Sequence, residues 1–134
     1  MKKILSVTLS FLCLLGTINM FGCNNFSQRE EKLYNLILDV SYEFKNPKSV
    51  RIISGTCEYF PDIDDSIYAF LRISAKNGFN AETDGYYFCW YNDEGKVCCA
   101  DLGKVGTATQ IQKCNERDDF DIKKINTALD NYWK

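Results

Sequence analysis

Residues 86–102, YYFCWYNDEGKVCCADL, decide how this chain folds. Both ends of the stretch are rich in aromatic and β-branched residues, which favour β-strands. Between them, residues 92–95 (NDEG) fit a three-residue hairpin loop, in which a type I turn is followed by glycine in the left-handed conformation. In this register Asn92 faces Lys96, and Cys89 faces Cys99. The stretch therefore predicts an antiparallel β-hairpin, the best-specified element of the chain.

Side chains alternate between the two faces of such a hairpin. We expect the core face to hold Tyr86, Phe88, Trp90, Cys98, Ala100 and Leu102. The outer face is then made by Tyr87, Cys89, Tyr91, Val97 and Cys99.

Two site predictions follow from this register. Cys89 and Cys99 form a non-hydrogen-bonded pair, whose Cα atoms approach to about 4.5 Å, and this is within the reach of a disulfide bond. We therefore predict a Cys89–Cys99 disulfide. Tyr87 and Tyr91, exposed on the outer face, become candidate binding residues, because aromatic side chains are enriched in recognition surfaces.

Helices are expected on both sides of the strands in sequence. Ser27 and Glu30 form a capping box, after which Leu33, Ile37, Val40 and Phe44 recur at helical spacing. This helix should end by Asn46, because Pro47 disfavours helical geometry in the residue before it. A second helix is expected at the end of the chain, with Asp121 as its N-cap and an apolar face made by Ile122, Ile125, Leu129 and Trp133.

The remaining segments complete an α+β pattern. Residues 49–59 and 67–74 read as strands, and residues 75–85 as a loop rich in turn-forming residues. We therefore predict an N-terminal helix, an antiparallel sheet of about four strands, and a C-terminal helix packed on the sheet. Residues 27–134 then form a single α+β domain, which suits their length.

The N-terminus has the features of an export signal. Lys2 and Lys3 precede an apolar run, residues 4–18, and the segment closes at Gly22 and Cys23. This pattern predicts a lipoprotein signal peptide over residues 1–22, lipidation of Cys23, and a short spacer over residues 23–26. Ordinary signal-peptidase cleavage and an uncleaved anchor are the alternatives. The expected location is the extracytoplasmic face of the cell membrane, held by the N-terminal lipid, or secretion if Cys23 is not acylated.

Composition excludes several classes of function. The net charge of −2 is the opposite of what a nucleic-acid-binding surface needs. The chain has seven cysteines and no histidine, and it lacks a C-x-x-C pair. Zinc binding and thioredoxin-type redox chemistry are therefore disfavoured, and we expect no metal and no cofactor. Export makes disulfides the natural interpretation of the cysteines, and Cys98 could pair with either Cys57 or Cys114.

Carboxylates are the remaining candidates for catalysis. The acidic loop at residues 61–65 lacks the glycine and closing glutamate of an EF-hand calcium loop, so we interpret it as a solvated turn. Paired carboxylates could still act in an extracellular hydrolase. The candidates are Glu58, Asp62, Asp64, Asp65, Glu82 and Asp84.

Four segments carry a resemblance: FKNPKSVRI at residues 44–52, ISAKNGF at 73–79, GYYF at 85–88 and KINTALDNYW at 124–133. The chain resembles a group of uncharacterised small exported proteins of Gram-positive bacteria. The resemblance implies export but no activity, and no site residues follow from it. The export signal and the lack of a catalytic constellation in the sequence lead us to expect a lipid-anchored, non-catalytic binding domain, whose partner is a cell-surface protein or a glycan. The alternative is the carboxylate hydrolase.

Overall fold

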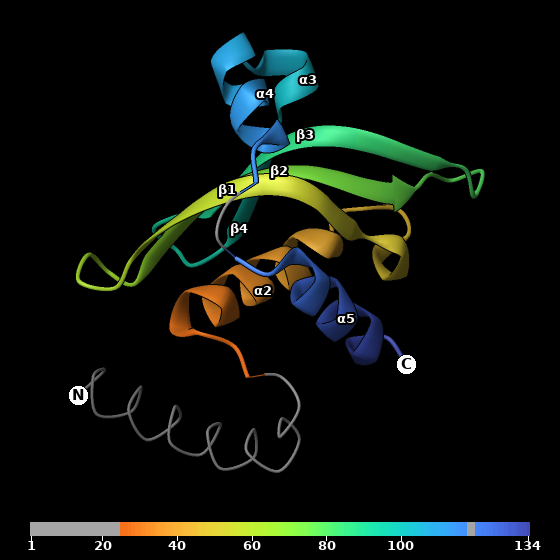
Figure 1. Cartoon of the computed structure of the whole chain (residues 1–134). Helices are drawn as coiled ribbons and strands as arrows, with labels where there is room; N and C mark the ends of the chain where they lie inside the picture. The colour runs from red at the N-terminus through yellow and green to blue at the C-terminus, as the bar shows by residue number, and fades with distance from the viewer. Residues whose placement is uncertain (1–24, 118–119) are drawn as a thin grey trace.

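The computed structural model describes residues 25–117 and 120–134 (Figure 1). The predicted signal peptide and Cys23 lie outside the described residues. The described elements follow the chain in this order: α2 (Gln28–Ser41), η1 (Pro47–Ser49), β1 (Arg51–Phe60), β2 (Ser66–Lys76), β3 (Glu82–Tyr91), β4 (Val97–Asp101), α3 (Leu102–Val105), α4 (Ala108–Asn115) and α5 (Ile122–Tyr132).

The strands form one antiparallel sheet in the order β1-β2-β3-β4. The sheet is curved like an arch, with α2 and α5 against its concave face and α3 and α4 above its convex face (Figure 1). The predicted α+β fold, with an N-terminal and a C-terminal helix flanking an antiparallel sheet, is confirmed.

Helix α2 begins at the predicted capping box. The Ser27 hydroxyl accepts a hydrogen bond from the backbone N–H of Glu30, and the Glu30 carboxylate accepts one from the N–H of Ser27. The helix ends at Ser41, earlier than the proline at position 47 requires. Its apolar stripe, Leu33, Leu36, Ile37 and Val40, is fully buried.

The core fills the space between the concave face and the two long helices. Leu71 and Ile73 contribute from β2, and Ile125 and Leu129 from α5, each with at most 1% of its surface exposed. Complete burial of a side chain of this size stabilises the fold by roughly 1.5–3 kcal/mol. This layer therefore fixes which face of the sheet the helices cover.

The edge of β1 is covered by other parts of the chain. The side-chain amide of Asn126 accepts a hydrogen bond from the N–H of Ile52 and donates one to its carbonyl, both at 2.9 Å. Further along, the N–H of Gly55 donates to the carbonyl of Glu116 at 2.8 Å. These contacts satisfy backbone groups that would otherwise form an open edge, where other chains can pair.

The hairpin register is as predicted, but the predicted core face is wrong. Cys89 pairs with Cys99 and Trp90 with Cys98. Cys89 is fully buried, and the face it shares with Tyr87, Tyr91, Val97 and Cys99 packs against the core. Phe88 and Trp90 lie on the convex face instead.

The alternation of side chains separates the two faces of a hairpin but does not indicate which face is buried. In this protein, pairing with β2 determines the buried face. Ala69 and Leu71 are fully buried on the concave face. Cys89 is paired with Ala69, and Tyr87 with Leu71. Directly paired residues share a face of the sheet, so these hairpin residues are carried to the concave side.

Two further segments differ from the prediction. Most of residues 75–85, expected to be a loop, extend β2 and β3, and the turn is confined to the segment between Lys76 and Glu82. Helices α3 and α4 were not predicted. Helix α4 begins at a capping box formed by Thr107 and Gln110, a signal that is present in the sequence.

Candidate functional site

The convex face of the sheet carries a row of aromatic side chains, which we call the aromatic row: Phe60, Tyr68, Phe70, Phe88 and Trp90. The rings of Phe88 and Trp90 stack with centroids 4.8 Å apart, and those of Phe70 and Phe88 with centroids 4.7 Å apart. Tyr68 lies nearly parallel to Phe88 at 6.3 Å and meets Phe60 edge-on at 6.1 Å. The row thus runs across three strands.

Helix α4 bounds the aromatic row at one end. The ammonium group of Lys113 lies 5.0 Å from the ring centroid of Phe70, a cation–π contact. A cavity of about 460 Å³ lies between this part of α4 and the sheet. Its lining combines rings of the row with side chains of both charges: Thr56, Cys57, Glu58, Tyr68, Phe70, Phe88, Lys113, Glu116 and Arg117.

The aromatic row is partly open. Tyr68 is 39% exposed, and the other four rings are half-buried. The predicted core residues Phe88 and Trp90 are therefore surface residues, placed together by pairing between β2 and β3.

Of the predicted binding residues, Tyr91 lies against α2 and Tyr87 against the segment that follows α2, rather than on an open face. Both are half-buried. The hydroxyl of Tyr91 donates a 2.5 Å hydrogen bond to the carboxylate of Asp39, and the ring of Tyr87 meets Phe44 edge-on at 5.3 Å. Burial raises the pKa of both tyrosines, and for Tyr91 the Asp39 carboxylate adds to this effect. Their predicted exposure is corrected because α2 and the segment after it pack against the face that they share.

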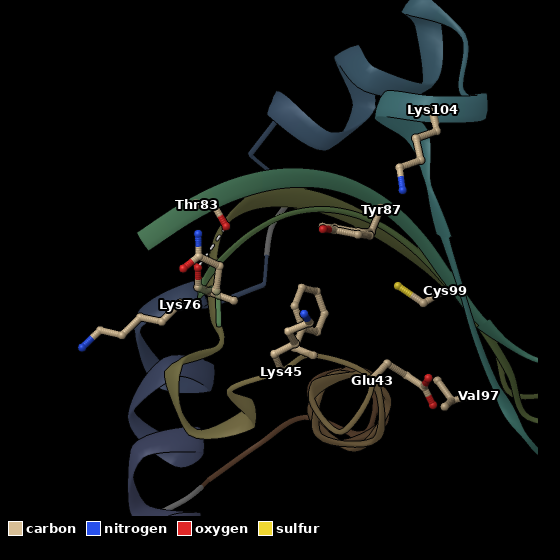
Figure 2. A pocket seen from close by; sticks show the side chains of 11 residues that line it. Glu43, Lys45, Lys76, Thr83, Tyr87, Val97, Cys99 and Lys104 are labelled. Carbon is tan, nitrogen blue, oxygen red and sulfur yellow. Dashed lines mark hydrogen bonds between the residues drawn. The ribbon is translucent and has the colours of Figure 1, made fainter. Parts of the chain in front are cut away.

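A second cavity, of about 590 Å³, lies on the concave side, and we call it the thiol pocket (Figure 2). Its lining comes from the segment after α2, from β2, β3 and β4, and from α3: Glu43, Phe44, Lys45, Ala75, Lys76, Asn77, Thr83, Tyr87, Val97, Cys99 and Lys104. Tyr87 therefore borders a cavity even though its ring also packs against Phe44. Three of the lining residues are lysines and one is a glutamate, which makes the pocket basic.

Cys99 contributes the thiol of this pocket. Its sulfur lies 3.7 Å from the sulfur of Cys89, behind it in the core. Both residues are thiols in this structure, and the separation exceeds the S–S bond length of about 2.05 Å. The predicted register is thus present, whereas the Cys89–Cys99 disulfide itself stays a prediction.

The other three cysteines among the described residues are separated by the sheet and its helices. Cys98 is on the convex side, where its thiol contacts the carbonyl of Lys96 at 3.9 Å. Cys114 is fully buried in α4, and its thiol contacts the carbonyl of Tyr87 at 3.8 Å. Cys57 lines the cavity beside the aromatic row. The pairing of Cys98 with either Cys57 or Cys114 stays a prediction with two alternatives.

The candidate carboxylates do not form one cluster, although Asp64 and Asp65 line the same cavity beside the acidic turn. Asp65, in the exposed acidic turn, contacts Lys32 and Tyr59, while Asp84 pairs with Arg72 at 2.8 Å and Glu82 accepts a hydrogen bond from Ser74. Only Glu58, from the predicted set, shares the cavity beside the aromatic row, where the unpredicted Glu116 joins it. Residues 25–117 and 120–134 contain no cluster of three or more potential metal ligands.

Within the same residues, no helix is long and apolar enough to cross a membrane. Comparison of the chain with protein-family models, with curated proteins and with solved structures finds no significant match. The case for a function therefore rests on the sequence and on the surfaces described above.

Proposed function

We propose that this chain is exported, anchored by a lipid on Cys23, and binds a protein at the cell surface through the aromatic row. The observation that carries the proposal is the row itself, five aromatic side chains gathered on a partly open sheet face. Aromatic side chains and arginine are enriched in protein interfaces, which typically combine an apolar centre with a polar rim. The row and the charged cavity beside it have this composition.

A protein surface suits the row better than a glycan does. Phe88 stacks with both Phe70 and Trp90, so each of these rings has at least one face against a neighbouring ring and less of it is open to a ligand. A sugar ring needs a free aromatic face on which to lie, whereas apolar side chains of a protein can pack against ring edges. The charged groups at the cavity, Lys113 and Glu116 among them, would then pair with charges of the partner.

Site-specific photo-cross-linking in producing bacteria tests the binding proposal. A photoreactive phenylalanine analogue in place of Tyr68 should cross-link to a discrete protein species, and Trp90→Ser introduced beside it should abolish that product. The same analogue in place of Tyr42, which is 55% exposed at the C-terminal end of α2, is the matched control and should give no such product. A product that is removed by glycan-degrading enzymes, or none at all, would contradict a protein partner.

Mass spectrometry of the N-terminal peptide tests the anchor separately. The expected species begins at Cys23 and carries acyl chains, because the apolar run of residues 4–18 directs export and the segment closes at this cysteine. An unmodified Cys23, or cleavage at another bond, would contradict the anchor without affecting the binding experiment.

A carboxylate hydrolase is the second candidate function. It is favoured by one observation, the shared cavity of Glu58 and Glu116 beside an aromatic surface. Both side chains are exposed, whereas a carboxyl group that acts as a general acid usually lies in a low-dielectric pocket. Polysaccharide hydrolysis that is lost in both Glu58→Gln and Glu116→Gln would favour the enzyme. Unchanged hydrolysis in both variants, or none in the wild type, would exclude it.

A further inference from the structure

The thiol pocket brings together a pair of cysteines with two different environments. Cys99 is half-buried and lines the pocket, whereas Cys89, directly opposite on β3, is fully buried behind it. Their sulfurs are 3.7 Å apart. A molecule in the pocket can therefore reach one sulfur directly, and the second sulfur only through the first.

The charge of the pocket indicates what kind of molecule could enter it. Lys45 and Lys104 approach the cavity from two sides, and Lys76 extends outward at its rim (Figure 2). Glu43 is the acidic side chain of the lining. A volume of about 590 Å³ lies within the range of small-molecule sites, roughly 300–1,000 Å³. The lining thus suits a small ligand with negative charge.

We propose that Cys89 and Cys99 are a redox-active pair that undergoes thiol–disulfide exchange with a small anionic disulfide bound in the thiol pocket. The thiolate of Cys99 attacks one sulfur of the ligand, a new S–S bond forms, and the ligand's own S–S bond breaks. The departing thiolate takes a proton from solvent. The sulfur of Cys89 then attacks Cys99, gives up its proton to the second departing thiolate, and closes the Cys89–Cys99 bond.

The proposed reaction balances in electrons and protons. The protein dithiol loses two electrons and two protons, and the ligand disulfide gains them and leaves as two thiols. Exchange of this kind proceeds through a mixed disulfide, and its rate depends on how much of the attacking thiol is deprotonated.

The pKa values of the two thiols differ in the direction that the proposed order of reaction steps requires. The hydrogen bond between them lowers the pKa of Cys99 and raises that of Cys89, which burial raises further. A lowered pKa increases the thiolate fraction of the exposed sulfur. Cys99 is therefore the attacking residue and Cys89 the resolving one.

The first experiment follows the covalent states of the full-length reduced protein exposed to oxidised glutathione, an anionic disulfide. Peptide mapping should recover a Cys89–Cys99 disulfide in the wild type and a stable glutathione adduct on Cys99 in Cys89→Ser. Cys99→Ser should form neither product, and Cys98→Ser, which alters the neighbouring thiol on the other face, should behave like the wild type. An adduct on Cys98 in place of Cys99, or no Cys89–Cys99 bond in the wild type, would overturn the proposal.

The second experiment tests the charge of the ligand and the reversibility of the bond. Replacing both Lys45 and Lys104 by Gln should slow the reaction with oxidised glutathione about tenfold at low ionic strength, since electrostatic steering contributes on this scale. Lys48→Gln, outside the pocket lining, is the matched control. Cystamine, a cationic disulfide, should react more slowly than oxidised glutathione with the wild type. Equal rates for the two probes, or a Cys89–Cys99 bond that reduced glutathione fails to open, would overturn the proposal.

Discussion

Tyr91 and Asp39 join the sheet to the helix that covers it: the tyrosine hydroxyl on β3 donates to the carboxylate on α2 at 2.5 Å. Asp39 itself is exposed, so the bond sits at the margin of the interface, with the aromatic ring directed inward against the core. A side chain held in this way is part of the packing between the layers. We therefore assign Tyr91 to stability, and the binding surface that we propose lies on the opposite face.

Replacing Tyr91 by Ser should lower the free energy of unfolding by about 2 kcal/mol, because truncating a buried aromatic side chain costs roughly 3–5 kcal/mol and this ring is half-buried. Denaturant unfolding measures the change. Phe79→Ser is the matched control, since Phe79 is 94% exposed and its replacement should alter stability by less than about 0.5 kcal/mol. Equal effects of the two substitutions would show that Tyr91 is not packed against α2.

The same tyrosine should make stability depend on alkaline pH. Burial and the Asp39 carboxylate raise the pKa of Tyr91, so the folded protein keeps a proton that the unfolded chain releases near pH 10. This contribution is fully present below about pH 10 and is lost as pH rises through the folded pKa. Unfolding measured across this range should decline less steeply in Tyr91→Phe than in the wild type, and equal slopes would contradict a raised pKa of Tyr91.

The features that the sequence predicted correctly are local. The capping box of Ser27 and Glu30, the N-cap at Asp121 and the register around Gly95 each depend on residues within a few positions of one another. Their hydrogen bonds form wherever the segment lies, so neighbouring residues suffice to predict them. The capping box at Thr107, which begins α4, is local in the same way and could have been predicted from the sequence.

The features that the sequence could not predict depend on residues far apart in the chain. Both faces of the hairpin carry aromatic side chains, so its own pattern could not say which face the helices cover; that choice came from its pairing with β2. The thiol pocket likewise combines Lys45, Cys99 and Lys104 from three different segments. Only the folded arrangement brings these residues together.

Gly55 should be intolerant of any side chain. Its φ angle is +152°, and a Cβ atom there would lie 2.3 Å from the carbonyl oxygen of Phe70 on the paired strand. Since that contact is with backbone, Gly55→Ala should cost about 3 kcal/mol, the scale expected of backbone strain in a packed region. In Gly78→Ala the nearest contact is the flexible side chain of Lys45 at 3.6 Å, and thermal unfolding should be nearly unchanged. A comparable loss in both variants would contradict this account.

Glu30 should link acid stability to the junction of α2 and α5. Its carboxylate accepts hydrogen bonds from the backbone N–H groups of Ser27 and Asp121, both at 3.1 Å, and from the ammonium group of Lys124 at 3.2 Å. Burial alone would raise the pKa of Glu30, but these donors outweigh it and the pKa is lowered. The charged form is therefore favoured in the folded protein.

A lowered pKa gives a contribution that is present above the unfolded value, near pH 4.3, and is lost as pH falls through the folded pKa. Glu30→Gln should lower the free energy of unfolding at pH 7 by about 1.5–3 kcal/mol, the range for hydrogen bonds to charged groups. The difference from the wild type should shrink as the pH falls through the folded pKa of Glu30, below which its carboxyl group is neutral like the Gln side chain. Glu31→Gln, at the exposed neighbouring position of the same helical turn, is the matched control. Urea unfolding of the wild type and both variants, at pH 7 and in acid, measures the difference. A difference that persisted unchanged in acid would mean that the side chain acts by its shape and not by its charge.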